Sequence, residues 1–91
     1  MVYFLTRIKV PDYDAWKPNF DADDPGARRD AKGHRILRSL DDPGEVYILV
    51  EFASDYDARA GRERLLASGV LDRFPEHGGP ILVEEAEHLT Y

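Results

Sequence analysis

Residues 35–52, RILRSLDDPGEVYILVEF, decide the fold of this chain. The stretch contains two runs typical of β-strands, joined by the break Asp41-Asp42-Pro43-Gly44. Because side chains alternate between the two faces of a strand, the second run presents two different surfaces. Its even-numbered face is wholly apolar and consists of Val46, Ile48, Val50 and Phe52. Its odd-numbered face carries Tyr47, Leu49 and Glu51. The stretch therefore predicts a central hairpin with one core face and one mixed face, which is half solvated or lines a cavity.

The segments on either side of this hairpin alternate between strand and helix patterns. Residues 2–10 read as a strand, and rings at positions 13, 16 and 20 recur at helical spacing. Asp12 or Asp14 can cap that first helix, and Pro18 predicts a kink or a restarted turn within it. The remaining segments are predicted as a short helix at 27–32, a strand at 34–40, a strand at 45–53, a helix from Ser54 or Asp55 to about Ser68, and a strand at 81–89.

This order of segments, β-α-β-β-α-β, predicts a ferredoxin-like α+β fold. Both helices then lie on one face of a four-stranded antiparallel sheet, and the first and third strands are its central neighbours. The opposite face carries Tyr3, Leu5, Tyr47 and Leu49, which is too apolar to leave in water on so small a domain. We therefore expect a homodimer in which the sheet of a second copy covers this face.

Length and charge limit the classes of function. The 91 residues fit a single domain, residues 1–91. A formal net charge of −6 argues against a nucleic-acid or anionic-membrane partner, because both need a positive field. The chain has no cysteine, and its histidines have no partners at ligand spacing, so a metal site is not expected. The N-terminus MVYFLTRIKV is too short and too soon charged for a signal peptide, which predicts a cytoplasmic protein.

The chain resembles the dimeric α+β barrel superfamily, in particular small proteins like the antibiotic-biosynthesis monooxygenases and related polyketide cyclases. The resemblance covers nearly the whole chain through its element order, and it includes the patterns VPDYDAW, RRDAKG and RSLDDPGEVYILVEF. It implies dimerisation through the sheets and a small, often aromatic ligand in a cavity between sheet and helices. Some such proteins oxidise anthrone-type polyketide intermediates without metal or flavin, so the resemblance implies no cofactor.

A hairpin loop with an even number of residues would bring polar groups together on the odd-numbered face, which we predict to line the cavity. In that register His34 lies opposite Glu51, and Arg38 lies opposite Tyr47. We predict His34 as a general base and Glu51 as the carboxylate that fixes its tautomer. The remaining candidates are substrate contacts: Tyr3, Arg7, Arg38 and Tyr47 as polar groups, and Trp16 as an apolar wall. A three-residue loop would turn His34 to the opposite face from Glu51.

The predicted function is a cofactor-independent monooxygenase or cyclase that deprotonates a small aromatic or polyketide-like molecule. The alternative is a non-catalytic dimeric binding or stress-response module whose cavity is small or filled. In that interpretation His34 and Glu51 form an exposed structural pair, and Trp16 belongs to the core. Cavity volume separates the two, because a space below about 300 Å3 lies under the usual range for ligand pockets.

Overall fold

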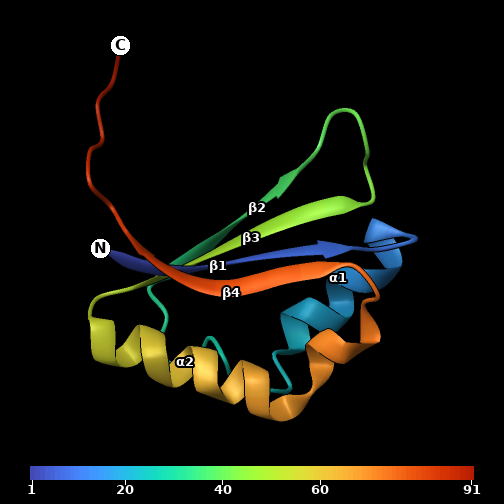
Figure 1. Ribbon diagram of the computed structural model, residues 1–91, viewed down its shortest axis with the longest axis horizontal. Helices are drawn as coiled ribbons and strands as arrows, with labels where there is room; N and C mark the ends of the chain where they lie inside the picture. The colour runs from blue at the N-terminus through green and yellow to red at the C-terminus, as the bar shows by residue number, and fades with distance from the viewer.

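Four strands form one antiparallel sheet in the order β2-β3-β1-β4 in the computed structural model, which describes residues 1–91 (Figure 1). The elements in chain order are β1 (Val2–Lys9), α1 (Tyr13–Ala22), β2 (Gly33–Arg38), β3 (Glu45–Phe52), α2 (Asp55–Ser68), the short 3-10 helix η1 (Val70–Arg73) and β4 (His77–Glu84). The predicted ferredoxin-like fold is therefore confirmed, with β1 and β3 as central neighbours.

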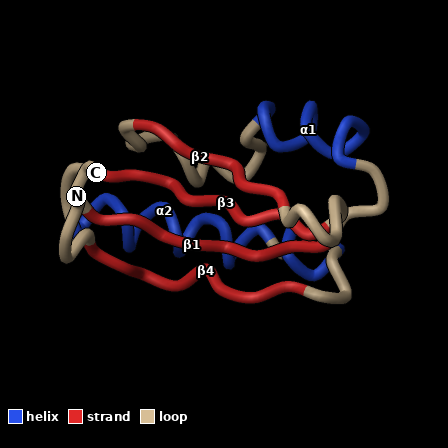
Figure 2. The backbone as a smooth tube through the Cα atoms, turned by 90° about the horizontal axis from the view of Figure 1, so that it is seen from above, coloured by secondary structure: helices blue, strands red, loops and turns tan.

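The core lies between the even-numbered face of the sheet and the helices. Its main side chains come from the two central strands: Phe4, Ile8, Val46, Ile48, Val50 and Phe52. From above, α2 runs beneath β1 and β3, whereas α1 lies toward the β2 edge (Figure 2). The apolar face predicted from the alternation is thus the face beneath the helices. No helix has both the length and the apolar composition needed to cross a membrane.

The first helix is capped as the sequence predicts, but the segment after it is not helical. The Asp12 carboxylate accepts hydrogen bonds from the backbone N–H of Asp14, at 3.0 Å, and of Ala15, at 3.4 Å. The helix continues through Pro18 to Ala22, so the predicted restart is wrong. Residues 27–32 form turns instead of the predicted short helix. The Asp23 carboxylate accepts hydrogen bonds from the backbone N–H groups of Ala27 and Arg28. Such local side-chain bonds stabilise a turn and compete with a helix.

The hairpin has a register that differs by one residue from the predicted one. Ser39 donates its N–H to the carbonyl of Glu45 at 3.0 Å, so residues 40–44 form an odd-length connection. The Ser39 hydroxyl accepts from the N–H groups of Asp41 and Asp42, and these local bonds hold the wider loop open. The predicted pairs of His34 with Glu51 and of Arg38 with Tyr47 are therefore wrong. In the structure His34 is paired with Val50, and Arg38 is paired with Val46.

The last strand begins and ends earlier than the predicted range 81–89. Pairing of β1 with β4 shifts between Leu5 and Arg7, and this bulge lets Gly78 pair with Arg7. The strand ends at Glu84, and residues 85–91 are irregular. They rise from the sheet on the side away from the helices (Figure 1). β4 is an edge strand, as predicted.

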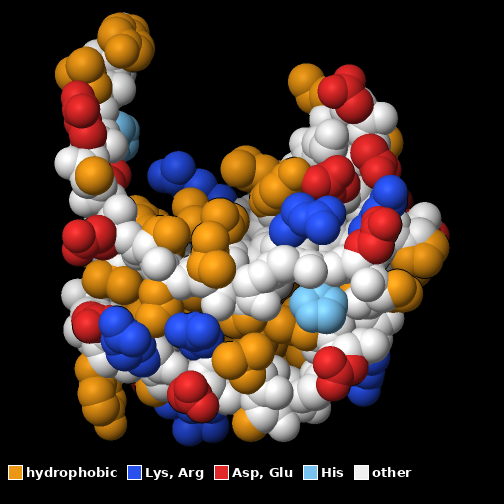
Figure 3. All heavy atoms as spheres, viewed as in Figure 1, with side chains coloured by type: hydrophobic (Ala, Val, Ile, Leu, Met, Phe, Trp, Pro, Cys, Tyr) orange, Lys and Arg blue, Asp and Glu red, His pale blue; other side chains and the backbone are white.

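The odd-numbered face of the sheet, which we call the open face, is covered by no element of this chain. Its central side chains are half-buried by their own neighbours, and they are Tyr3, Leu5, Arg7, Tyr47, Leu49 and Glu51. Leu37 on β2 and Ile81 on β4 are 57% and 52% exposed. Figure 3 shows hydrophobic side chains in the hollow between the C-terminal segment and the β2–β3 hairpin.

Candidate functional site

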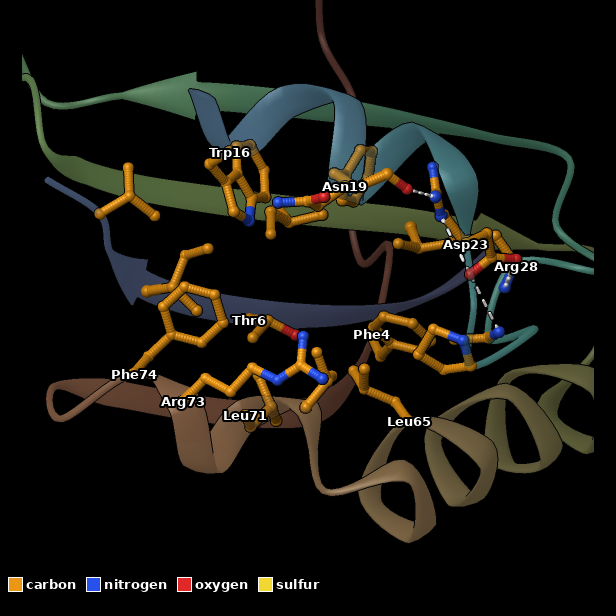
Figure 4. Close-up of a pocket in the computed structure, with 18 of the residues that line it drawn as sticks. Phe4, Thr6, Trp16, Asn19, Asp23, Arg28, Leu65, Leu71, Arg73 and Phe74 are labelled. Atoms are coloured by element: carbon orange, nitrogen blue, oxygen red, sulfur yellow. Dashed lines mark hydrogen bonds and ion pairs between the residues drawn. The ribbon is translucent and has the colours of Figure 1, made fainter. Parts of the chain in front are cut away.

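A cavity of about 400 Å3 lies between the even-numbered face of the sheet, α1, the start of the following turn, and the region from Leu65 to Phe74 (Figure 4). Its larger apolar lining residues are Phe4, Ile8, Val10, Trp16, Phe20, Ile48, Val50, Leu65, Leu71 and Phe74. Its polar lining residues are Thr6, Asp12, Asn19, Asp23, Arg28 and Arg73. The volume falls within the range of ligand pockets, and an apolar wall with few polar groups is typical of them.

One wall of the cavity is a row of neighbouring rings on α1 that are tilted against one another. Trp16 and Phe20 lie one helical turn apart, and their ring centroids are 5.1 Å apart at an interplanar angle of 37°. Tyr13 extends the row beyond the cavity, 5.6 Å from Trp16. Trp16, predicted as an apolar wall, lines the cavity. Such flat, polarisable surfaces favour a planar aromatic ligand, which stacks on rings at comparable separations.

Arg28 holds this wall in place and is not free to bind a ligand. Its guanidinium lies 3.6 Å from the centroid of the Phe20 ring, donates to the Phe20 carbonyl oxygen, and pairs with Asp23 at 3.6 Å. Asp23 in turn caps the end of α1 and accepts two backbone N–H groups. The charge of Arg28 is thus satisfied within the protein, and its contribution to the cavity is to fix Phe20.

Two polar groups in the cavity have no such partners. Thr6 is 2% exposed, and its hydroxyl oxygen has no hydrogen-bond partner. Arg73, the last residue of η1, extends toward Thr6 in Figure 4 and forms no ion pair. Neither residue was predicted. The signal for Thr6 was present in the sequence, because it interrupts an otherwise apolar face between Phe4 and Ile8.

The predicted base and its orienting carboxylate lie on opposite faces of the sheet. His34 is paired with Val50, on the same side as the cavity, and Glu51 is paired with Gly33, on the open face. The His34 ring packs edge-on against Phe20, with centroids 5.1 Å apart, but does not line the cavity. Burial lowers its pKa below 6.5, and the neighbouring cations Arg28 and Lys17 lower it further.

The other predicted contacts lie outside the cavity. Arg38 places its guanidinium 4.5 Å from the Tyr13 ring centroid. The remaining three are on the open face: Tyr3, Arg7 and Tyr47. Arg7 pairs with Glu45 at 3.5 Å, and the Tyr47 hydroxyl donates to the same carboxylate, a hydrogen bond that raises the pKa of Tyr47. Of the seven predicted site residues, the cavity contains Trp16 alone.

No group of three or more His, Asp or Glu side chains lies close enough together to hold a metal ion. Asp12 and Asp23, the two carboxylates that line the cavity, are both engaged as acceptors of backbone N–H groups, Asp12 at the start of α1 and Asp23 in the turn after it. What the arrangement offers is an apolar, ring-walled space with one buried hydroxyl and one unpaired guanidinium.

Solved structures with the same fold span the whole chain. A protein from Nitrosomonas europaea, provisionally described as an antibiotic biosynthesis monooxygenase, aligns with a TM-score of 0.62 and 22% identity, covering 96% of this chain and 100% of its own. SnoaB from Streptomyces nogalater, a cofactor-independent oxygenase, aligns with a TM-score of 0.68 and 19% identity, covering 99% and 97%. A Deinococcus radiodurans protein with the same provisional description as the first aligns with a TM-score of 0.66 and 13% identity, covering 100% and 98%.

No protein-family model and no curated protein matches the sequence. At these identities, the likeness to the solved structures establishes the fold that the sequence resemblance implied.

Proposed function

We propose that this chain binds a small planar aromatic molecule in the cavity beneath α1 and oxidises it without a cofactor. The observation that carries the proposal is the cavity itself, about 400 Å3 of largely apolar space walled by Trp16, Phe20 and Phe74. Its volume exceeds the roughly 300 Å3 below which a filled, non-binding fold would be favoured. The oxygenase described among the solved structures of this fold supports the reaction class.

The chemistry needs the chain to lower the cost of forming a carbanion. An anthrone-type substrate loses a proton from its activated methylene, and the resulting enolate supplies the electrons that reduce molecular oxygen. The methylene becomes a carbonyl, and the second oxygen atom leaves as water. A guanidinium in a largely apolar cavity stabilises such an enolate far more than it would in water, which is the role proposed for Arg73.

The proposal keeps His34 as the candidate base; because it packs against Phe20 and does not line the cavity, it would take the substrate proton only through an intervening water. Its lowered pKa favours the neutral imidazole near neutral pH, which is the form able to accept a proton. Glu51 cannot orient it, because Glu51 lies on the open face. Tyr3, Arg7 and Tyr47 then belong to the subunit contact rather than to the substrate site.

A homodimer through the open face is part of the same proposal, as is the cytoplasmic location expected from the sequence. No element of this chain covers the half-buried side chains of this face, and Leu37 and Ile81 are more than half exposed. A second sheet packed there would cover them and would leave the cavity, on the other side of the sheet, unobstructed.

A second candidate is a non-catalytic binder of the same class of ligand. No histidine lines the cavity, and both lining carboxylates, Asp12 and Asp23, are engaged as backbone acceptors. Under this alternative the protein sequesters or carries an aromatic compound and releases it unchanged.

One pair of measurements separates the two functions. Trp16 is the only tryptophan of the chain and lines the cavity, so its fluorescence reports binding there. We expect anthrone to quench Trp16 and to be consumed with oxygen uptake above the buffer rate. The variants His34→Ala and Arg73→Met are each expected to lower that uptake by about tenfold or more, whereas Arg59→Met, on the outer face of α2, leaves it unchanged. Quenching without oxygen uptake supports the binder, and no quenching contradicts both.

A further inference from the structure

The Thr6 hydroxyl is a buried polar group without a partner in a cavity that is otherwise apolar at its floor. Thr6 lies in the middle of β1 on the face that carries Phe4 and Ile8, and its strand partner on β3 is Ile48. It is 2% exposed and its oxygen forms no hydrogen bond within the protein. A buried hydroxyl normally forms a hydrogen bond, because burial without a partner forfeits the hydrogen bonds that it would make to water.

The location of this hydroxyl explains what could satisfy it. Thr6 lines the cavity, and in Figure 4 its oxygen points into the space between β1, α1 and η1. The remaining polar lining groups lie on helices and turns around this space and not on the sheet that forms its floor. An oxygen atom at the leading end of an aromatic ligand would therefore meet Thr6 and no other uncharged polar group on the sheet.

We propose that Thr6 is a specificity-determining contact, which selects aromatic ligands carrying a phenolic or ketone oxygen over plain aromatic hydrocarbons. The proposal rests on the proposed function, since it requires that the cavity receives an aromatic molecule. A threonine hydroxyl both donates and accepts, so it pairs with a carbonyl, a phenol or a phenolate. Arg73 extends toward the same region and favours a ligand oxygen that carries negative charge.

The preference for an oxygen-bearing ligand is strong because binding of a hydrocarbon carries a free-energy penalty. A ligand with a suitable oxygen satisfies Thr6, whereas a hydrocarbon of the same shape leaves the hydroxyl unpaired and excludes water from it. Sites built around a buried polar group reject the ligand that lacks the matching group more strongly than apolar sites reject an extra methylene. The chain's own wall residues, Trp16 and Phe20, supply the attraction common to both ligands.

The test compares 1-naphthol with naphthalene, using Trp16 quenching as the readout. The wild-type chain is expected to bind 1-naphthol about tenfold more tightly than naphthalene. Thr6→Val keeps the shape and removes the hydroxyl, so it is expected to lose this preference while its naphthalene affinity is unchanged. Thr6→Ser keeps the hydroxyl and the preference. Thr90→Val, which makes the same chemical change in the exposed C-terminal segment, is the matched control.

Two results separate failure of this inference from failure of the proposed function. If neither probe quenches Trp16 in the wild type, the cavity is not an aromatic site and both proposals fall. If both probes bind but the ratio of their affinities is the same in the wild type and in Thr6→Val, the cavity stands and the role of Thr6 is overturned. Thermal unfolding of Thr6→Val checks its fold, and because the hydroxyl forms no hydrogen bond within the protein, its melting temperature is expected to be no lower than that of the wild type.

Discussion

The imidazole of His34 has a different electrostatic environment from that of a free histidine. It packs edge-on against Phe20 at 5.1 Å, and its pKa is lowered first by burial and then by the cations Arg28 and Lys17, against the opposing effect of Asp21. Because the native pKa lies below the unfolded value of 6.5, the unfolded chain binds the proton more readily. This residue therefore destabilises the fold progressively as the pH falls from 6.5 to the native pKa.

We predict that Lys17→Gln raises the pKa of His34. The substitution removes one cation and also frees Asp21, which pairs with Lys17 at 2.6 Å, and both changes favour the imidazolium. The measurement is an NMR titration of the imidazole signals, with His34 assigned through His34→Gln. Arg59→Gln is the matched control, because it breaks the equivalent helical pair with Asp55, at 2.7 Å, whose charges do not shift the pKa of His34. An unchanged or lower His34 pKa in Lys17→Gln would refute this electrostatic account.

Single residues also show where sequence reasoning reached its limit. Trp16 could be placed because one helix face is readable from spacing alone. Phe74 and Arg73 could not be placed in a cavity, since they reach it only through the packing of η1 against elements far away in the sequence. Thr6 was readable as a polar residue on an apolar face, but the alternation does not tell whether the space above a strand is filled or empty.

The helix α2 approaches the sheet through a glycine. A Cβ atom at Gly61 would lie 2.5 Å from the carbonyl oxygen of Ala27 and 3.0 Å from Cζ of Phe52, and Gly61 is buried. Alanine is favoured over glycine in a helix by about 1 kcal/mol. The contact with a backbone oxygen is too close to be relieved by a side-chain rotation, so the steric cost outweighs this gain.

We predict that Gly61→Ala lowers the free energy of unfolding by about 1–3 kcal/mol. The measurement is urea unfolding followed by circular dichroism. Gly33→Ala is the control, because a Cβ at Gly33 meets no atom within 4 Å and its expected effect is within roughly 0.5 kcal/mol. Equal stabilities of Gly61→Ala and the wild type would contradict the close approach of α2 to the turn at Ala27.

Elements were more predictable than the connections between them. The order of strands and helices follows from periodicity and from the breaks, and it is correct. The register of the hairpin depends on whether the connection has an odd or an even number of residues, and local side-chain bonds from Ser39 and Asp42 decided this. A shift of one residue moved His34 and Arg38 to the other face, so the predicted site separated although the predicted sheet was right.

At the scale of the whole molecule, the open face leads to a prediction about oligomeric state. Leu5 on β1 and Leu49 on β3 are partners at the centre of this face, because β1 and β3 are the two middle strands. We predict that the wild type sediments at roughly twice the chain mass of 10.4 kDa, and that Leu49→Lys sediments as a single chain. A lysine there would place an unpaired charge within an apolar contact between two sheets.

The matched control is Tyr56→Lys, which changes an 80% exposed side chain on α2, away from the open face. It is expected to sediment like the wild type. A wild type that sediments as a single chain at micromolar concentration would contradict the proposed homodimer. Because the cavity lies on the other side of the sheet, Leu49→Lys is also expected to retain Trp16 quenching by 1-naphthol.

The alternation along β1 has an evolutionary consequence. Leu5 and Thr6 are consecutive in the chain, yet Leu5 lies on the open face, which is the proposed surface of self-association, and Thr6 lines the cavity, which is the proposed ligand site. If both proposals hold, substitutions at odd positions of the central strands alter the contact between copies while the even positions preserve the cavity. Under the proposed homodimer, a directed-evolution library confined to the odd codons of β1 and β3 would vary the contact between copies without touching the even-numbered residues that form the core and line the cavity.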